Sequence, residues 1–351
     1  MLIVSLGITT VAQPRARFLK LVHNFGTFSE ESGLARCKFA LVNDGTSPLT
    51  ILSARATCGC TTPEYSRKPI APGDTAYISV AYDPSMRPGR FSKQIVVETN
   101  GTPSKARLEI KGVVIGSEST IKGRYPNDFG PLKLAWKNLA LGEATMNHMK
   151  TVYLEGYNRS DDSLSVKFEN VPPYINIVSA PEIVPPGEQV TFIAYVTPKK
   201  GTPYGLVEDD IMIMPAPGLR FKLPFFLSVK EDFSNLDAER LEKSPIAALS
   251  TDRVELGKIS VASEPISVKL RLNNLGKSDL LVRRVYSSEK GVTAKIGSSA
   301  IKKGKYTDIT VDIDPKMLDG SMVNCRLNII TNDPLQPVQT VRLVGEWIDK
   351  K

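Results

Sequence analysis

Residues 72–84 read PGDTAYISVAYDP, a stretch that opens on a Pro-Gly turn and closes on an Asp-Pro. Between turn and closing proline, apolar and polar side chains alternate, which is typical of an antiparallel strand with one buried face. The arrangement returns at 186–198 as PGEQVTFIAYVTP and at 303–315 as KGKYTDITVDIDP, and in each copy the closing proline lies 11 residues beyond the turn glycine. Three copies in register indicate one structural unit repeated three times.

Two further landmarks precede this stretch in each copy. An Asn-x-Gly or Asn-x-Ser turn lies 29 or 30 residues before the turn glycine, at Asn43, Asn158 and Asn274. An apolar residue followed by glycine opens each copy, at Phe25-Gly26, Phe129-Gly130 and Leu256-Gly257. The interval from this glycine to the asparagine is 17 residues in the outer copies and 28 in the middle copy, which predicts a longer first hairpin there.

Short alternating strands separated by Asn-Gly and Pro-Gly turns predict an all-β protein of three tandem immunoglobulin-like β-sandwich domains joined by short linkers. The expected domains are 21–116, a divergent 117–230, and 251–351. Residues 1–20 are expected to form a leader and lead-in, and 231–250 a helical linker. Its helical pattern covers 235–243 and ends before Pro245. We expect the three domains to form an extended rod.

The first residues indicate export. Residues 1–11 read MLIVSLGITTV, an apolar run too short to span a bilayer, and Thr10-Val11-Ala12 is a small-x-small pattern with cleavage expected after Ala12. Because no Lys or Arg precedes the run, a misassigned start codon and an N-terminal strand stay open as alternatives. The expected compartment is the periplasm, with outer-membrane association as a further candidate.

The chain has 351 residues and a formal net charge of +8, which is unevenly spread. Basic residues outnumber acidic ones before residue 117 and after residue 245, whereas the middle third is acidic. Two basic modules favour an acidic partner or a membrane surface, although a solubilising surface explains the same charge. No basic stripe with interleaved aromatic side chains is present, so nucleic acid is not expected as a partner.

The first copy resembles a known bacterial family, the domain of unknown function DUF1573, over residues 21–116. The matching segments are HNFGTF (23–28), FALVNDG (39–45), CGCT (58–61) and IAPGD (70–74). This family is similar to the ASH and major-sperm-protein-like immunoglobulin folds. The third copy is similar to the general ASH pattern through Asn332-Asp-Pro334 and Leu343-Val-Gly345, without the cysteines. The resemblance implies a cell-envelope protein without enzyme activity, usual in Bacteroidota and related bacteria.

The Cys58-Gly59-Cys60 segment is the sharpest chemical feature of the chain. Two thiols at this spacing are candidate ligands for Cu(I) or Zn(II), with His23 as a candidate third ligand. Alternatively they form a redox pair, whose disulfide would close a small, easily reduced ring. One of them could also bridge to Cys37, or both could pack under the loop. Cys37 and Cys325 are in phase with apolar neighbours and are expected to be buried thiols.

No sequence motif of a hydrolase, metalloprotease, nucleotide-binding loop or dinucleotide-binding fold is present, and we predict no enzyme activity, cofactor or small-molecule substrate. The expected function is a non-catalytic scaffold that binds other envelope proteins as a subunit of a complex. A thiol- or metal-handling module at Cys58 and Cys60 is the first alternative. A carbohydrate-binding module is the second, but Tyr125, Trp136 and Trp347 are too scattered in the sequence to favour it.

Overall fold

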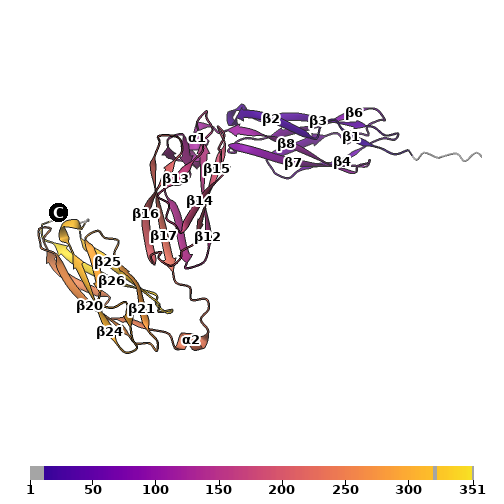
Figure 1. Cartoon of the computed structure of the whole chain (residues 1–351). Coiled ribbons are helices and arrows are strands. Elements are labelled where there is room, and N and C mark those ends of the chain that lie inside the picture. The colour runs from indigo at the N-terminus through magenta and orange to yellow at the C-terminus, as the bar shows by residue number, and fades with distance from the viewer. Residues whose placement is uncertain (1–11, 319–321, 350–351) are drawn as a thin grey trace, which may run out of the picture.

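The computed structural model of the chain describes residues 12–318 and 322–349. The predicted leader, 1–11, lies outside the described residues. Figure 1 shows three β-sandwiches in chain order, each built from two sheets. The prediction of an all-β chain of immunoglobulin-like sandwiches is confirmed.

The first domain pairs two four-stranded sheets. One has the order β1 (Ala16–Phe18), β3 (Ala35–Asn43), β6 (Thr75–Tyr82), β5 (Thr61–Tyr65). The other has the order β2 (Val22–Ser29), β8 (Lys105–Ile115), β7 (Gly89–Thr99), β4 (Ile51–Ala56). A 3-10 turn, Glu30–Ser32, follows β2.

The middle domain begins after a short helix, α1 (Glu118–Arg124). Its five-stranded sheet has the order β14 (Ile175–Ala180), β15 (Gln189–Val196), β12 (Lys150–Asn158), β10 (Leu132–Leu134), β9 (Asn127–Phe129). Its four-stranded sheet has the order β11 (Leu139–Thr145), β17 (Phe221–Lys230), β16 (Gly205–Met214), β13 (Lys167–Glu169).

The third domain follows a second helix, α2 (Ala238–Glu242), which lies within the predicted helical stretch. Its four-stranded sheet has the order β18 (Ala247–Leu249), β20 (Ile266–Asn274), β24 (Tyr306–Ile313), β22 (Val292–Ile296). Its five-stranded sheet has the order β19 (Arg253–Ile259), β26 (Val338–Trp347), β25 (Val323–Thr331), β21 (Leu280–Tyr286), β23 (Ala300–Ile301). A 3-10 turn, Pro315–Met317, lies between β24 and β25.

The three domains repeat one strand plan, which corrects one sequence prediction. In each domain an early strand runs parallel to the last strand and carries a bulge: β2 on β8, β11 on β17, β19 on β26. The bulge glycines have positive φ, and in the middle domain this glycine is Gly142. Gly130 instead lies between β9 and β10. Since Gly142 precedes Asn158 by 16 residues, the longer first hairpin predicted for the middle copy is wrong.

Each sandwich has its own hydrophobic core. In β6 the side chains that alternate along the sequence 75–82 also alternate between the core and the surface. Ile78, Val80 and Tyr82 face the core and are at most 1% exposed. The matching positions of β15 and β24 are also buried, as period-two strands of a two-layer sandwich require.

The three landmark asparagines are fully buried and do more than initiate turns. The side-chain amide of Asn274 donates to the carbonyl oxygens of Ser278 at 2.7 Å and Ile301 at 2.9 Å. Its carbonyl oxygen accepts from the backbone nitrogen of Gly276 at 3.0 Å. Asn43 and Asn158 make the equivalent three bonds. Each asparagine therefore joins its own turn to the segment that precedes the turn glycine, which explains their fixed interval.

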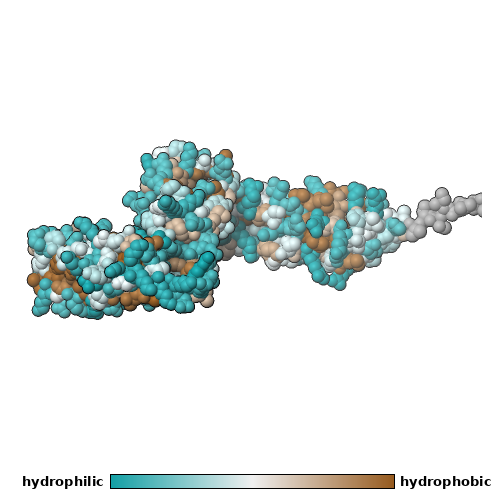
Figure 2. Space-filling model, turned by 60° about the horizontal axis from the view of Figure 1, so that its bottom comes forward, coloured by the Kyte–Doolittle hydropathy of each residue, from teal (hydrophilic) through white to brown (hydrophobic). Residues whose placement is uncertain are grey.

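The expected extended rod of three domains is bent at both junctions. In Figure 1 the first domain extends sideways from one end of the middle domain, and the third lies beside the opposite end. Figure 2 shows hydrophobic patches on all three domains, separated by hydrophilic surface. The helix α1 lies at the first bend and was not anticipated from the sequence, because its seven residues carry little apolar periodicity.

Candidate functional site

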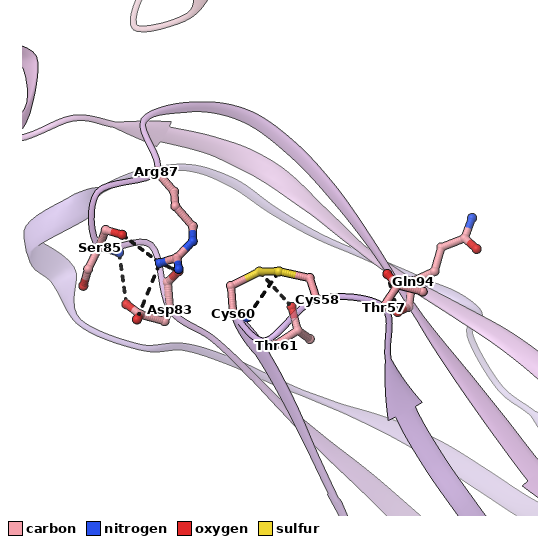
Figure 3. The surroundings of a disulfide bond; sticks show 8 residues. All are labelled: Thr57, Cys58, Cys60, Thr61, Asp83, Ser85, Arg87 and Gln94. Atoms are coloured by element: carbon pink, nitrogen blue, oxygen red, sulfur yellow. Dashed lines mark hydrogen bonds and ion pairs between the residues drawn. A yellow bond between two sulfur atoms is a disulfide. The ribbon is translucent and has the colours of Figure 1, made fainter. Parts of the chain in front are cut away.

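The Cys58-Gly59-Cys60 turn joins β4 to β5, which are edge strands of opposite sheets in the first domain. A disulfide links Cys58 to Cys60 (Figure 3). The backbone nitrogen of Cys60 donates to Cys58 Sγ at 3.2 Å, and its carbonyl oxygen accepts from the backbone nitrogen of Asp83 at 2.9 Å. Cys60 is buried and Cys58 is partly exposed. The turn is therefore held on one side at the end of β6 and on the other at β7, where the backbone nitrogen of Thr57 donates to the carbonyl oxygen of Gln94 at 3.1 Å.

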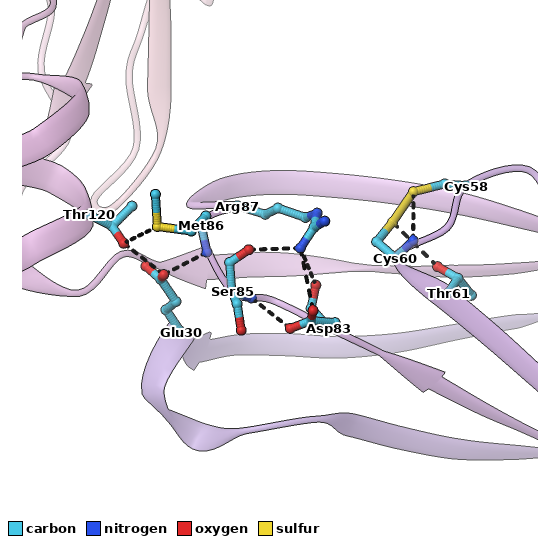
Figure 4. A network of polar contacts seen from close by, with 9 residues as sticks. All are labelled: Glu30, Cys58, Cys60, Thr61, Asp83, Ser85, Met86, Arg87 and Thr120. Atoms are coloured by element: carbon cyan, nitrogen blue, oxygen red, sulfur yellow. Dashed lines mark hydrogen bonds and ion pairs between the residues drawn. A yellow bond between two sulfur atoms is a disulfide. The ribbon is translucent and has the colours of Figure 1, made fainter.

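The loop after β6 connects this turn to the first bend of the chain (Figure 4). Arg87 Nη1 donates to the carbonyl oxygens of Asp83 at 3.3 Å and Ser85 at 2.7 Å. The next residue back, Met86, has φ of 61° and donates its backbone N–H to Glu30 at 2.7 Å. The loop thus places one backbone donor directly on a buried carboxylate.

Glu30 is the polar centre of the junction between the first domain and α1. Its side chain is 8% exposed and accepts from the backbone nitrogens of Met86 and Ser117 and from the hydroxyl of Thr120 at 2.7–2.9 Å. Burial raises the pKa of Glu30, but these donated bonds together outweigh it and hold the pKa below its usual 4.5. A satisfied, buried carboxylate fixes the direction in which the chain leaves β8.

A second carboxylate ties the first domain to the middle domain directly. Glu188, 6% exposed, accepts two bonds from Arg90 of β7, at 3.1 and 2.6 Å. The hydroxyl of Tyr157 accepts from the backbone nitrogen of Gly116 at 3.3 Å. Gly187 leaves room for Ile115, because a Cβ at this glycine would lie 2.0 Å from Ile115 Cδ1. The first two domains are thus joined by polar and steric contacts on both sides of the connection.

The junction between the middle and third domains uses the same kinds of contact. Arg283 donates to both carboxylate oxygens of Glu231, at 2.9 and 2.5 Å. Arg284 Nη1 donates to the carbonyl oxygens of Tyr204 at 3.0 Å and Leu206 at 2.8 Å. The backbone nitrogen of Leu206 donates to the hydroxyl of Tyr286 at 2.9 Å. Of these two neighbouring arginines of β21, Arg283 therefore holds the residue that follows β17, and Arg284 holds the start of β16.

The predicted metal set is not assembled in this structure. Cys58 and Cys60 are bonded to each other, so neither sulfur is a thiolate ligand, and the ring of His23 contacts Phe25. Within 12–318 and 322–349, no group of three or more His, Cys, Asp or Glu side chains lies together in a way that could hold a metal ion. Of the open alternatives for these cysteines, the structure shows the C-x-C disulfide.

Cys37 and Cys325 are free and buried, as expected from their phase with apolar neighbours. The alternative of a bridge from Cys37 to the Cys58-Gly59-Cys60 turn is not what the structure shows. Burial raises the pKa of each thiol to about 11, so both remain protonated at neutral pH. Neither is a candidate nucleophile.

The first and third domains match two different family models. Residues 16–114 match the family model of a protein of unknown function, DUF1573. The match covers the first domain, hereafter the DUF1573 domain. Residues 245–346 match a second model, the HYDIN/CFA65/VesB-like Ig-like domain. The resemblance predicted for the first copy is confirmed. A search of curated proteins returned no match to the chain.

Several solved structures match the chain at low identity and with TM-scores under 0.5. A protein of unknown function from Porphyromonas gingivalis W83 is 18% identical, with a TM-score of 0.48, covering 62% of this chain and 100% of its own. The ASH/PapD-like domain 7 of human CEP192 is 15% identical, with a TM-score of 0.25, covering 34% and 99%. Titin domains I67–I69 are 12% identical, with a TM-score of 0.22, covering 96% and 99%. The fold assignment rests on the strand pairing described above.

Replacing both cysteines of the turn, Cys58→Ser/Cys60→Ser, is expected to lower the stability of the DUF1573 domain by only about 1–2 kcal/mol. The disulfide closes a loop of three residues, and chain-entropy stabilisation falls with loop length. The other two domains also form their matching strands without it. Differential scanning calorimetry measures the loss.

The matched comparison is Cys37→Ser, which should cost more because it buries a hydroxyl among apolar side chains. Thiol titration of denatured protein should find the two free cysteines without reductant and all four with it. Unfolding of the DUF1573 domain in the double serine variant would contradict this account.

The Glu30 junction is expected to weaken in acid. A carboxyl whose pKa is lower in the folded state contributes stability above its unfolded pKa, near 4.5, and loses it as the pH falls through the folded value. Denaturant unfolding at pH 3.5 and pH 6 should therefore show a larger loss for the native chain than for Glu30→Gln. A variant with the same pH dependence as the native chain would remove this role for Glu30.

The aromatic residues considered for sugar binding do not share a surface. Tyr125 is 1% exposed and packs on Tyr157 near the DUF1573 domain, whereas Trp136 is 69% exposed. Trp347 packs against the core of the third domain.

No helix within the described residues has both the length and the apolar character to cross a membrane.

The sequence pointed to the Cys58-Gly59-Cys60 turn, with its disulfide as one of several open alternatives, but to neither junction. Glu30, Glu188 and Glu231 carry no shared local signal, because acidic residues near turns and strand ends are common and nothing in the surrounding sequence marks all three. Their partners lie 52 to 98 residues away in sequence, and only the domain arrangement brings them together. One sequence feature could have pointed to the first junction: Glu188 is a charged residue directly after the repeated turn Pro186-Gly187.

Proposed function

We propose that this protein is a non-catalytic scaffold of the bacterial cell envelope, exported to the periplasm, that binds other proteins as a subunit of a complex. Its immunoglobulin-like and DUF1573 domains are of the kind that forms protein-interaction modules. The observation that carries the proposal is the construction of the two junctions, where Arg90 with Glu188 and Arg283 with Glu231 form bidentate ion pairs across domain boundaries.

A bidentate arginine–carboxylate pair is directional as well as attractive. At each junction it acts together with a tyrosine hydroxyl bonded to backbone and a glycine that permits close approach: Tyr157 with Gly187, and Tyr286 with Gly205. Domains that only needed to be tethered would require none of these contacts. Holding three domains in one arrangement supports binding of a partner at fixed relative positions on more than one domain.

Chemical crosslinking in the native host, followed by affinity capture of the tagged chain from the envelope fraction, tests the proposal. The expected result is a reproducible set of proteins absent from a control that expresses the tag alone. Arg283→Ala/Arg284→Ala should lose part of this set, because the third domain is no longer held. Cys58→Ser/Cys60→Ser should retain it.

Capture of no protein above the control would contradict the proposal. Loss of the whole set in the double serine variant, with the fold intact, would instead support the alternative in which the cysteine turn is the working site.

A further inference from the structure

Three arginines form a row across the outer face of the five-stranded sheet in the third domain. Arg253 of β19 lies opposite Arg342 of β26, which lies opposite Arg326 of β25. All three side chains are exposed. Neighbouring strands are about 4.8 Å apart, so the row places three positive charges within about 10 Å. Like charges directly opposite each other destabilise a sheet, and such a row needs a reason other than folding.

Two of these arginines form no ion pair with another described residue. Arg253 pairs with Glu255 at 2.5 Å, whereas Arg326 and Arg342 have no side-chain hydrogen bond or ion pair within the described residues. Their guanidinium groups share a hollow with Asp252 and Glu289 but bond to neither, and they are open to an external anion.

The same row in the other two domains carries no such charge. In the first domain, where the strands pair equivalently, Val22 lies opposite Glu109, which lies opposite Gln94. In the middle domain Pro224 lies opposite Asp210. The strand plan therefore forms without basic residues in these positions, and the arginines are a property of the third domain alone.

The face changes from charged to apolar along the strands. Next to the arginine row, Thr340 lies opposite Asn328, and the following pair is Val338 opposite Ile330. This last pair lines a cavity of about 840 Å³ between the third and middle domains, which Val229 and Leu335 also line. Arg342 and Val338 are four residues apart, or about 14 Å along an extended strand. The cavity therefore continues directly from the arginine row.

We propose that this face binds an extended segment of a partner protein that carries acidic side chains and, about four residues further on, an apolar side chain. The inference rests on the proposed scaffold function and names the surface and the partner chemistry. Carboxylates pair with the free guanidinium groups of Arg326 and Arg342, and the apolar side chain fills the interdomain cavity. Arginine at the centre of an interface is among the residues most often responsible for affinity.

The surroundings of the row favour a peptide over other anions. Membrane binding needs apolar side chains beside the basic ones to enter the bilayer, but the hollow around the arginines is lined mainly by polar and acidic side chains, among them Asp252, Glu289 and Asn324. An anionic glycan would satisfy the arginines but would leave the adjoining apolar cavity empty. A peptide occupies both ends of the surface at once.

Selection of random 12-residue peptides displayed on phage against the immobilised full chain tests the proposal. Enriched peptides should carry an acidic cluster with an apolar residue three to five positions away. Fluorescein-labelled copies of the enriched peptides should bind in anisotropy measurements, and their affinity should fall at least tenfold in Arg326→Gln/Arg342→Gln. Val338→Asp should also weaken binding at least tenfold.

The matched control is Lys269→Gln/Lys295→Gln, which removes the same charge from the opposite outer face of the same domain and should change affinity less than twofold. Circular dichroism and thermal unfolding check that each variant remains folded. Enriched peptides without acidic residues, or equal affinity in both pairs of variants, would overturn the proposal.

Two further results would also overturn it. In one, phosphatidylglycerol vesicles or dextran sulfate bind through Arg326 and Arg342 while no peptide is enriched. In the other, the arginine variant captures the full set of envelope proteins, which would reject this surface while leaving the scaffold function intact. Capture of no protein even by the native chain would instead reject the scaffold function itself.

Discussion

Asn274→Ala is expected to lower the free energy of unfolding of the third domain by about 3 kcal/mol. The substitution removes three hydrogen bonds at a position that is 0% exposed. It leaves the carbonyl oxygens of Ser278 and Ile301 without the amide nitrogen that donates to both, and it leaves a small void. Guanidinium unfolding in a Trp136→Phe background, followed by the fluorescence of Trp347, which packs on the core of this domain, measures the loss.

The matched control is the neighbouring residue, in Asn273→Ala. Its side chain makes one bond, to the carbonyl oxygen of Ala248 at 3.2 Å, and is only partly buried, so the expected cost is below about 1 kcal/mol. Similar costs for the two variants would show that the asparagine does not join the turn to the segment before Gly304. Asn43→Ala and Asn158→Ala should reproduce the larger cost in their own domains.

Arg283→Ala/Arg284→Ala is expected to release the third domain from the middle domain. The double variant removes the bidentate pair with Glu231 and both donations to the backbone of Tyr204 and Leu206. Without these contacts the amide of Leu206 also loses its fixed partner, the hydroxyl of Tyr286. Hydrogen exchange over residues 204–207 should become at least tenfold faster.

The comparison variant is Arg271→Ala, whose side chain pairs with Asp308 and stacks on Tyr306 inside the third domain. Exchange over 204–207 should not change in this variant. Unchanged exchange in the Arg283→Ala/Arg284→Ala variant would mean that the two arginines do not hold the junction.

The sequence was sufficient for the fold because period-two alternation and turn chemistry are local. The stretch 72–84 and its two counterparts predict a strand, its buried face and its repetition. The three predicted strands are β6, β15 and β24 of the structure. The one error in the repeat came from the middle copy, where Phe129-Gly130 resembles the opening landmark. Only the parallel pairing of β11 with β17 identifies Gly142 as the equivalent glycine.

The binding surface and the junctions could not be predicted from the sequence, because they depend on strand register and on how the domains are arranged. Arg253, Arg326 and Arg342 lie 16 to 89 residues apart, and strand pairing is what places them side by side. The buried carboxylates of Glu30 and Glu188 acquire their partners only when the domains meet. By contrast, the closeness of Cys58 and Cys60 follows directly from their spacing.

Small-angle X-ray scattering of the full chain in dilute solution tests the central claim, that built junctions hold three immunoglobulin-like domains in one bent arrangement. The account predicts a profile that a single conformation with the domain arrangement of Figure 1 reproduces, at low and at moderate salt. A profile that requires a broad ensemble of domain orientations, or a straight rod, would contradict it.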